Sequence, residues 1–149
     1  MQGNAPGRAT TSGTGLADLA ESLSRLQSRT VTVSGPAHPV ALAEPVVDEL
    51  VSVVRACLDN VTRHVGEDAP AWVLVEELED RVVVTVRDEG AGIEPGRLDD
   101  ALEEGRMGVT ESIRGRMADL GGEAVLITGP GQGTEWELVV DNRVDGLRS

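Results

Sequence analysis

An acidic side chain and two glycines follow a buried strand in this sequence. The β-branched run at residues 82–86 predicts that strand, and Asp88, Gly90 and Gly92 come just beyond it. A carboxylate at a strand end can accept a hydrogen bond from an exocyclic amine, and glycines beside it let a flat ring approach the backbone without a Cβ clash. The spacing therefore predicts a ligand-reading carboxylate at Asp88. The simpler interpretation is an aspartate that begins a turn.

Two other segments could complete such a site. Asn60 lies on a long predicted helix and offers a hard amide oxygen of the kind that magnesium binds. Residues 129–133, Gly-Pro-Gly-Gln-Gly, form a glycine-rich turn that leads into Thr134, where a strand begins. Taken alone, a solvent-facing helical asparagine and a threonine with good β propensity explain Asn60 and Thr134 as well.

Hydrophobic periodicity predicts the elements that would position these residues. Helices are expected at residues 43–65 and 108–120, and strands at 30–34, 72–76, 82–87, 123–128 and 134–140. Leu16, Leu19, Leu23 and Leu26 fall at helical spacing and predict a short amphipathic helix. A polar segment at 94–107 contains a predicted helical turn at 98–104 that Gly105 would stop. Helices that alternate with mostly antiparallel strands predict an α/β (α+β) two-layer sandwich, with one face of the sheet covered by helices.

In this order the segments resemble the ATP site of the gyrase, heat-shock chaperone, histidine kinase and mismatch-repair superfamily, the GHKL or Bergerat fold. Residues 55–64 resemble the N box of a sensor histidine kinase, residues 88–93 the G1 box and residues 105–109 the G2 box. Residues 111–122 are similar to the segment after the lid in short-lid sensor histidine kinases of the actinobacterial type. The resemblance covers residues 30–140 and implies an HATPase-type, ATP-binding domain.

The resemblance also implies roles for the matching residues. Asp88 would bind the adenine amino group with Thr134 nearby, and Asn60 would hold the Mg²⁺ that bridges the phosphates of ATP. The N-terminus of the helix at 108–120 suits those phosphates, because its free N–H groups and its dipole favour anions. The other implied ATP-binding residues are Arg63, Gly90, Gly92, Ile93, Gly105, Met107, Gly108, Val109 and Gly133. A solvated surface arginine explains Arg63 equally well.

One position departs from the family pattern. Most N boxes carry a glutamate four residues before the asparagine, on the same face of the helix, where it can orient or deprotonate the attacking group. This chain has Ala56 there. Glu49 lies on a similar face but about 16 Å away along the helix, and Asp59 points about 100° away around it. The sequence thus supports nucleotide binding better than efficient phosphoryl transfer, and it names no certain catalytic residue.

Neither histidine of the chain fits the phosphate acceptor of such a kinase. His64 ends the N box and is interpreted as structural, and His38 lies in a predicted loop. In the kinases that the chain resembles, the acceptor lies on a separate dimerisation helix. The expected partners are therefore that histidine-bearing helix of the full-length kinase and, downstream, a response regulator with a helix-turn-helix output domain. Cys57 falls on the apolar stripe of the long helix and is expected in the core.

Composition is that of one soluble domain. The chain has 149 residues, and its formal net charge of −13 would repel nucleic acid and an anionic membrane surface. It has no apolar stretch long enough to span a bilayer, and its one cysteine suits a reducing compartment. We expect a cytoplasmic domain of a membrane-anchored kinase, without direct membrane contact. Residues 1–15 would be a disordered leader, 16–142 the ATP-binding domain and 143–149 a C-terminal tail.

Three functions remain open at this stage. The first is the catalytic, ATP-binding domain of a two-component sensor histidine kinase, which transfers the γ-phosphoryl of ATP to a histidine on another helix. The second is an anti-sigma-type serine kinase, which shares the N and G1 boxes, although residues 112–122 fit histidine kinases better. The third is a nucleotide-binding pseudo-kinase, which Ala56 favours.

Overall fold

The computed structural model describes residues 15–89, 107–128 and 133–141. Its main sheet has five strands in the order β2-β4-β5-β7-β6. These strands are β2 (Val31–Ser34), β4 (Ala71–Glu77), β5 (Arg81–Asp88), β6 (Glu123–Thr128) and β7 (Thr134–Asp141). Strands β2 and β4 pair in parallel, and the other neighbours are antiparallel. Each of these strands was expected from the sequence.

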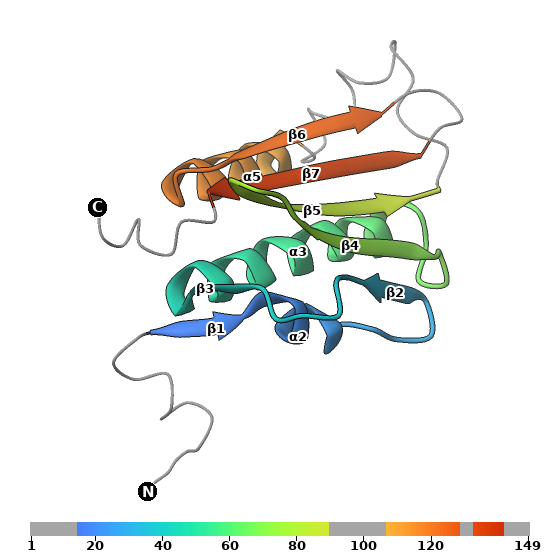
Figure 1. Ribbon diagram of the computed structural model, residues 1–149. Helices are drawn as coiled ribbons and strands as arrows, with labels where there is room; N and C mark the ends of the chain where they lie inside the picture. Colours follow the sequence, from blue (N-terminus) through green and yellow to red (C-terminus); the bar gives the residue numbers. More distant parts are fainter. Residues whose placement is uncertain (1–14, 90–106, 129–132, 142–149) are drawn as a thin grey trace, which may run out of the picture.

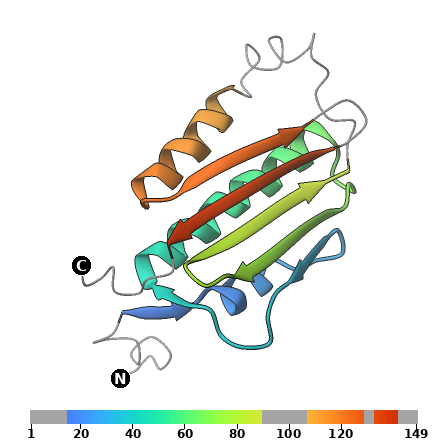
Figure 2. The same ribbon diagram turned by 45° about the horizontal axis from the view of Figure 1, so that its top comes forward.

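Two helices, α3 (Glu44–His64) and α5 (Met107–Asp119), lie on the same face of this sheet (Figures 1 and 2). This arrangement confirms the predicted two-layer α/β architecture, a mostly antiparallel sheet with helices on one face. Both helix predictions agree with the structure to within one residue at each end. No helix in the described ranges is long and apolar enough to cross a membrane. The helical turn expected at 98–104 and its cap Gly105 lie outside the described residues.

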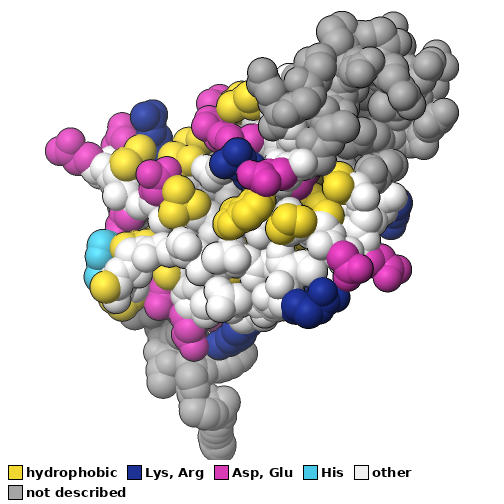
Figure 3. Space-filling model, turned by 90° about the vertical axis from the view of Figure 1, so that its right-hand side faces the viewer, with side chains coloured by type: hydrophobic (Ala, Val, Ile, Leu, Met, Phe, Trp, Pro, Cys, Tyr) yellow, Lys and Arg dark blue, Asp and Glu magenta, His cyan; other side chains and the backbone are white. Residues whose placement is uncertain are grey.

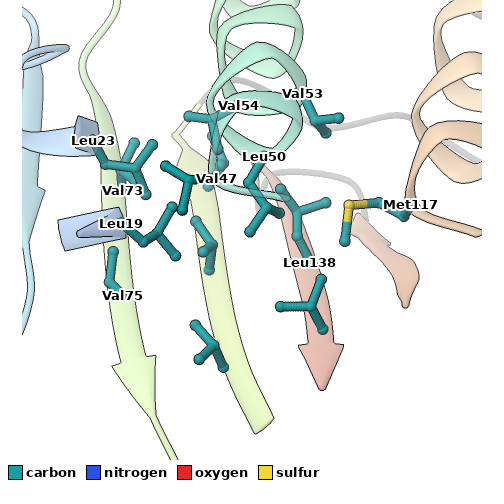
Figure 4. Close-up of a cluster of buried hydrophobic side chains, with 14 of the residues drawn as sticks. Leu19, Leu23, Val47, Leu50, Val53, Val54, Val73, Val75, Met117 and Leu138 are labelled. Carbon is teal, nitrogen blue, oxygen red and sulfur yellow. The ribbon is translucent and has the colours of Figure 1, made fainter. Parts of the chain in front are cut away.

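The core forms between α3, α5 and the covered face of the sheet. Alternate residues of β5 and β7 point into it, because successive side chains of a strand point to opposite faces. Figure 4 shows Leu50 of α3, Leu138 of β7 and Met117 of α5 within this cluster, and all three are fully buried. Cys57 is also in the core, as predicted, and burial raises the pKa of its thiol to about 12.

The prediction of a helix from Leu16 is wrong in its first turn. Residues Leu16–Asp18 form strand β1, which pairs with the unpredicted strand β3 (Ala41–Ala43), and only then does α2 (Leu19–Ser24) begin. Pairing with β3 makes the strand, and Asp18 sets where the helix starts, since its side chain accepts hydrogen bonds from the backbone N–H groups of Ala20 at 3.0 Å and Val40 at 2.9 Å. It caps the helix and ties it to the chain before β3.

The turn between β6 and β7 ends at Gly133, which only glycine can occupy without strain. Its φ is +72°, in the left-handed region. A Cβ placed there would overlap the carbonyl oxygen of Asp88 and would come within 3.0 Å of the Cα of Glu89. The backbone of the turn therefore packs directly against the end of β5.

This close approach predicts opposite effects for two glycine-to-alanine changes. Gly133→Ala should lower the free energy of unfolding by about 2 kcal/mol or more, from left-handed strain and the clash at Asp88. Gly115→Ala should raise it by roughly 0.5–1 kcal/mol, because Gly115 lies within α5 and a Cβ there meets nothing within 4 Å. Urea denaturation of both variants measures the difference. Equal stabilities for the two would show that Gly133 is not in close contact with β5.

Candidate nucleotide-binding site

Four element ends point toward the same side of the molecule. Figure 2 shows α3 and α5 running in opposite directions behind the sheet, so that α3 ends and α5 begins toward the same side as the end of β5 and the start of β7. Figure 3 looks at the molecule from this side, where apolar side chains lie at the surface among acidic and basic ones. These ends carry Asn60, Gly108, Asp88 and Thr134, each predicted to belong to the site.

Asp88 is the last residue of β5 and is 5% exposed. In the described part of the chain it is the one buried charged residue. It follows the buried Val82, Val84 and Val86 at the strand's period of two, so its side chain points to the face that the helices cover. A buried charge must be hydrogen-bonded or paired, and a carboxylate at a strand end has two oxygens that can also accept hydrogen bonds from a ligand.

Thr134 lies directly opposite Asp88 in the antiparallel pairing of β5 with β7. Residues opposite one another in such a pair have Cβ atoms roughly 5 Å apart and point to the same face. The hydroxyl of Thr128, on β6, donates a hydrogen bond to the carbonyl oxygen of Gly133 at 3.0 Å and lies 3.4 Å from the hydroxyl of Thr134. Gly133, Thr134 and Asp88 are therefore brought together, as the sequence predicted.

Thr128 was missed from the sequence. Its partner residue in the hairpin is Thr134, so the two threonines face each other across the turn. The signal was present in the near-symmetrical placement of a threonine on each side of the glycine-rich turn at 129–133. A pair of hydroxyls beside a carboxylate adds a donor and an acceptor to this edge of the site.

Asn60 lies in the last turns of α3 and is half-buried. Its Oδ1 atom is buried and has no hydrogen-bond partner among the described residues. An unsatisfied buried acceptor typically costs about 1–3 kcal/mol, so it calls for an explanation. An amide oxygen is a hard ligand that suits Mg²⁺, and this atom therefore fits the cation that the family resemblance implies.

The other residues of α3 considered for this site are exposed, half-buried or bonded to α5. Arg63 and Asp59 are exposed, so the guanidinium group of Arg63 is accessible both to solvent and to a ligand. Ala56, one turn before Asn60, is half-buried. Glu49 is engaged elsewhere, because its Oε2 accepts a hydrogen bond from Nε of Arg116 at 2.6 Å.

The phosphate side of the predicted site is described only in part. Gly90, Gly92, Ile93 and Gly105 lie outside the described residues. Met107, Gly108 and Val109 form the first turn of α5, which carries no acidic residue. The free N–H groups and the dipole of that turn favour anion binding.

Comparison with solved structures shows the same fold in histidine kinases. The histidine kinase domain of the blue-light-activated histidine kinase of Erythrobacter litoralis EL346 has 24% identity and a TM-score of 0.56, over 81% of this chain and 60% of that one. The histidine kinase AdeS of Acinetobacter baumannii has 18% identity and a TM-score of 0.62, over 86% of this chain and 66% of that one. In a longer structure of the Erythrobacter kinase the match spans 39% of that chain.

No curated protein sequence matches this chain. A family model does, over residues 46–144, and its description is histidine kinase-, DNA gyrase B-, and HSP90-like ATPase. The matched range includes Asn60, Asp88, the start of α5 and Thr134. Because that range is more than half of the 149 residues, this chain belongs to the family of histidine kinase-, DNA gyrase B- and HSP90-like ATPases.

Proposed function

We propose that this chain is the ATP-binding catalytic domain of a two-component sensor histidine kinase. It would bind ATP with Mg²⁺ and transfer the γ-phosphoryl group to a histidine on a separate dimerisation helix. The observation that carries the proposal is the buried Asp88 at the end of β5, with Thr134 opposite it and the Gly133 backbone against it. Membership of the ATPase family and the fold shared with two histidine kinases support it.

Each ligand group has a proposed partner. Asp88 accepts a hydrogen bond from the adenine amino group, and Thr134 and the close backbone at Gly133 define that edge of the base pocket. Asn60 supplies to the metal ion its Oδ1, which has no hydrogen-bond partner among the described residues. The first turn of α5 faces the phosphates. The same proposal assigns nucleotide contacts to Arg63 and, beyond the described residues, to Gly90, Gly92, Ile93 and Gly105.

The chemistry would rest on positioning and on charge stabilisation, which dominate phosphoryl transfer. An imidazole nitrogen of the acceptor forms a bond to the γ-phosphorus while the bond from that phosphorus to the bridging oxygen breaks, and ADP leaves. Bound Mg²⁺ would neutralise phosphate charge. The chain's own residues orient the nucleotide through Asp88 and hold the phosphates at α5. Ala56 offers no carboxylate to orient or deprotonate the attacking nitrogen.

The acceptor must come from elsewhere. His38 is an exposed residue between β2 and β3 and does not lie on a helix, and its Nε2 lies 2.8 Å from Oε1 of Glu77. We therefore propose as partners the histidine-bearing helix of a full-length kinase and, after it, a helix-turn-helix response regulator. By the same reasoning the domain would work in the cytoplasm. The actinobacterial short-lid class remains part of this proposal.

A nucleotide-binding pseudo-kinase is the second candidate. It is favoured by Ala56, which is half-buried on α3 and leaves a methyl group where most N boxes have a glutamate. In that case the domain would bind ATP as proposed, but nothing would be phosphorylated. Transfer to a histidine helix supplied in trans separates the two functions.

The assignment of Asp88 predicts that Asp88→Asn weakens ATP binding by about tenfold or more. The new NH₂ group places a donor opposite the adenine amine, and a mismatched buried polar pair costs about 1–3 kcal/mol. Calorimetric titration with Mg·ATP measures the change. Asp59→Asn is the matched control, because it removes the same charge from an exposed position on α3 and should leave the affinity within twofold. Unchanged affinity in Asp88→Asn would remove Asp88 from the site.

The missing carboxylate predicts slow transfer in the native chain. Incubated alone with labelled ATP, the chain should not label itself; with its histidine helix in trans, transfer should be measurable but slow. A lost general base costs about 10²–10⁴-fold, so Ala56→Glu should raise the rate without tightening ATP binding. Single-turnover transfer and calorimetry give the two quantities. A native rate that Ala56→Glu fails to improve would show that this position does not limit catalysis.

A further inference from the structure

An ion pair joins the two helices that carry the site. Nε of Arg116, on α5, donates to Oε2 of Glu49, on α3, at 2.6 Å, and its Nη2 donates to the hydroxyl of Ser52. The side chains of Arg116 and Glu49 are 30% and 37% exposed, so water only partly screens the contact. Arg116 also acts on Cys57 of α3. Burial raises the pKa of the Cys57 thiol, and the positive charge of Arg116 partly opposes this rise.

The ion pair between Glu49 and Arg116 lies at similar distances along the two helices from Asn60 and from the start of α5. Because α3 and α5 are antiparallel (Figure 2), moving along α3 toward its end corresponds to moving back along α5 toward its start. Asn60 is 11 residues beyond Glu49, roughly 16 Å along the axis, and Met107 is nine residues before Arg116, roughly 14 Å. The start of α5 therefore comes level with Asn60.

Asn60 and Glu49 also project from α3 in nearly the same direction. Eleven residues at about 100° each return to within roughly 20° of the starting direction, so Asn60 projects from the same face of α3 as Glu49. That face is turned to α5, because Glu49 bonds to Arg116 on it. Ala56, seven residues after Glu49, lies on the same line. The ion pair thus lies on the face of α3 that also carries Ala56 and Asn60, and this face runs toward the side on which α5 begins.

The apolar contacts of α5 fix its distance from the sheet better than they fix its position along its own axis. Ile113 and Met117 are fully buried in the core, but apolar packing is non-directional and an unbranched methionine adapts to several positions. A guanidinium group that donates in a fixed fork to a carboxylate and a hydroxyl is directional. Displacement of α5 along its axis would break both of these hydrogen bonds.

We infer that Arg116, through Glu49 and Ser52, is a positioning residue that sets the axial position of α5 and so holds its first-turn N–H groups opposite Asn60. This inference rests on the proposed function, because it takes the phosphates to lie between those groups. Arg116 does not touch them: Gly108 is eight residues away, about 12 Å along the helix. Its loss should weaken binding of the triphosphate and spare binding of the base.

The test compares the affinities of Mg·ATP and adenosine, by calorimetry and by NMR shift titration. In Arg116→Met we expect the affinity for ATP to fall roughly tenfold, as when a group that orients ligand-binding residues is lost. The affinity for adenosine should stay within about twofold of that of the native chain. Arg114→Met is the control, since Arg114 is exposed on the same helix and its loss changes the net charge equally. That control should leave both affinities within about twofold.

Two further variants keep the test decisive if Arg116→Met does not fold. Glu49→Gln should weaken ATP binding in the same direction but less, and the exchange Glu49→Arg with Arg116→Glu should recover part of it. An ATP-to-adenosine affinity ratio unchanged in all of these variants would overturn the inference while the proposed function stands, and so would a parallel loss of both ligands. If the native chain binds no ATP, the proposed function fails and the inference fails with it.

Discussion

The antiparallel pairing of β5 with β7 is the constraint on which the candidate site depends. Its register sets Asp88 opposite Thr134, and the left-handed Gly133 brings the turn's backbone onto the end of β5. A carboxylate is thereby held at a strand end, where it is 5% exposed. Such burial opposes folding unless the charge is hydrogen-bonded. The sheet thus places one directional group where a flat, hydrogen-bonding ligand can approach from beyond the strand ends.

Binding ATP, a polyanion, on a chain of net charge −13 requires local sources of positive potential. Exposed charges beyond a Debye length of about 8 Å are largely screened, so the nearest groups decide. In the proposed site these would be the first turn of α5, which is free of acidic residues, and a cation held at Oδ1 of Asn60, which has no hydrogen-bond partner among the described residues. Both lie on the helix layer, so the site's electrostatics depend on how α5 sits against α3.

Local sequence patterns predicted most of the fold, because β-branched runs and apolar stripes report burial within one element. They failed at Leu16–Asp18, where the leucine spacing is helical but pairing with Ala41–Ala43, 23 or more residues away, makes a strand. Asp88, Gly133 and Thr134 were brought together as expected, since all three lie at strand ends of one sheet. The hydrogen bond from Arg116 to Glu49 spans 67 residues, and no periodicity signals such a contact.

No pattern in the sequence indicates that Oδ1 of Asn60 is buried without a hydrogen-bond partner among the described residues. Whether a buried acceptor finds a donor depends on how helix and neighbours pack in three dimensions, not on spacing along the chain. The family resemblance implied a metal-binding role for Asn60, and a buried amide oxygen is compatible with that role. The place of Ala56 on the face of α3 turned to α5 could likewise be worked out only once the Glu49 contact was known.

The most direct test of the central claim is an NMR titration of the ¹⁵N-labelled chain with ADP and Mg²⁺. The account predicts that the amide signals of Glu89, Gly133 and Thr134, the side-chain amide of Asn60 and the first turn of α5 shift together along one binding curve. Leu74, 40% exposed on β4, should stay unchanged. Saturable shifts confined to other parts of the sheet, or no shifts at millimolar ADP, would contradict a nucleotide site at this end of the molecule.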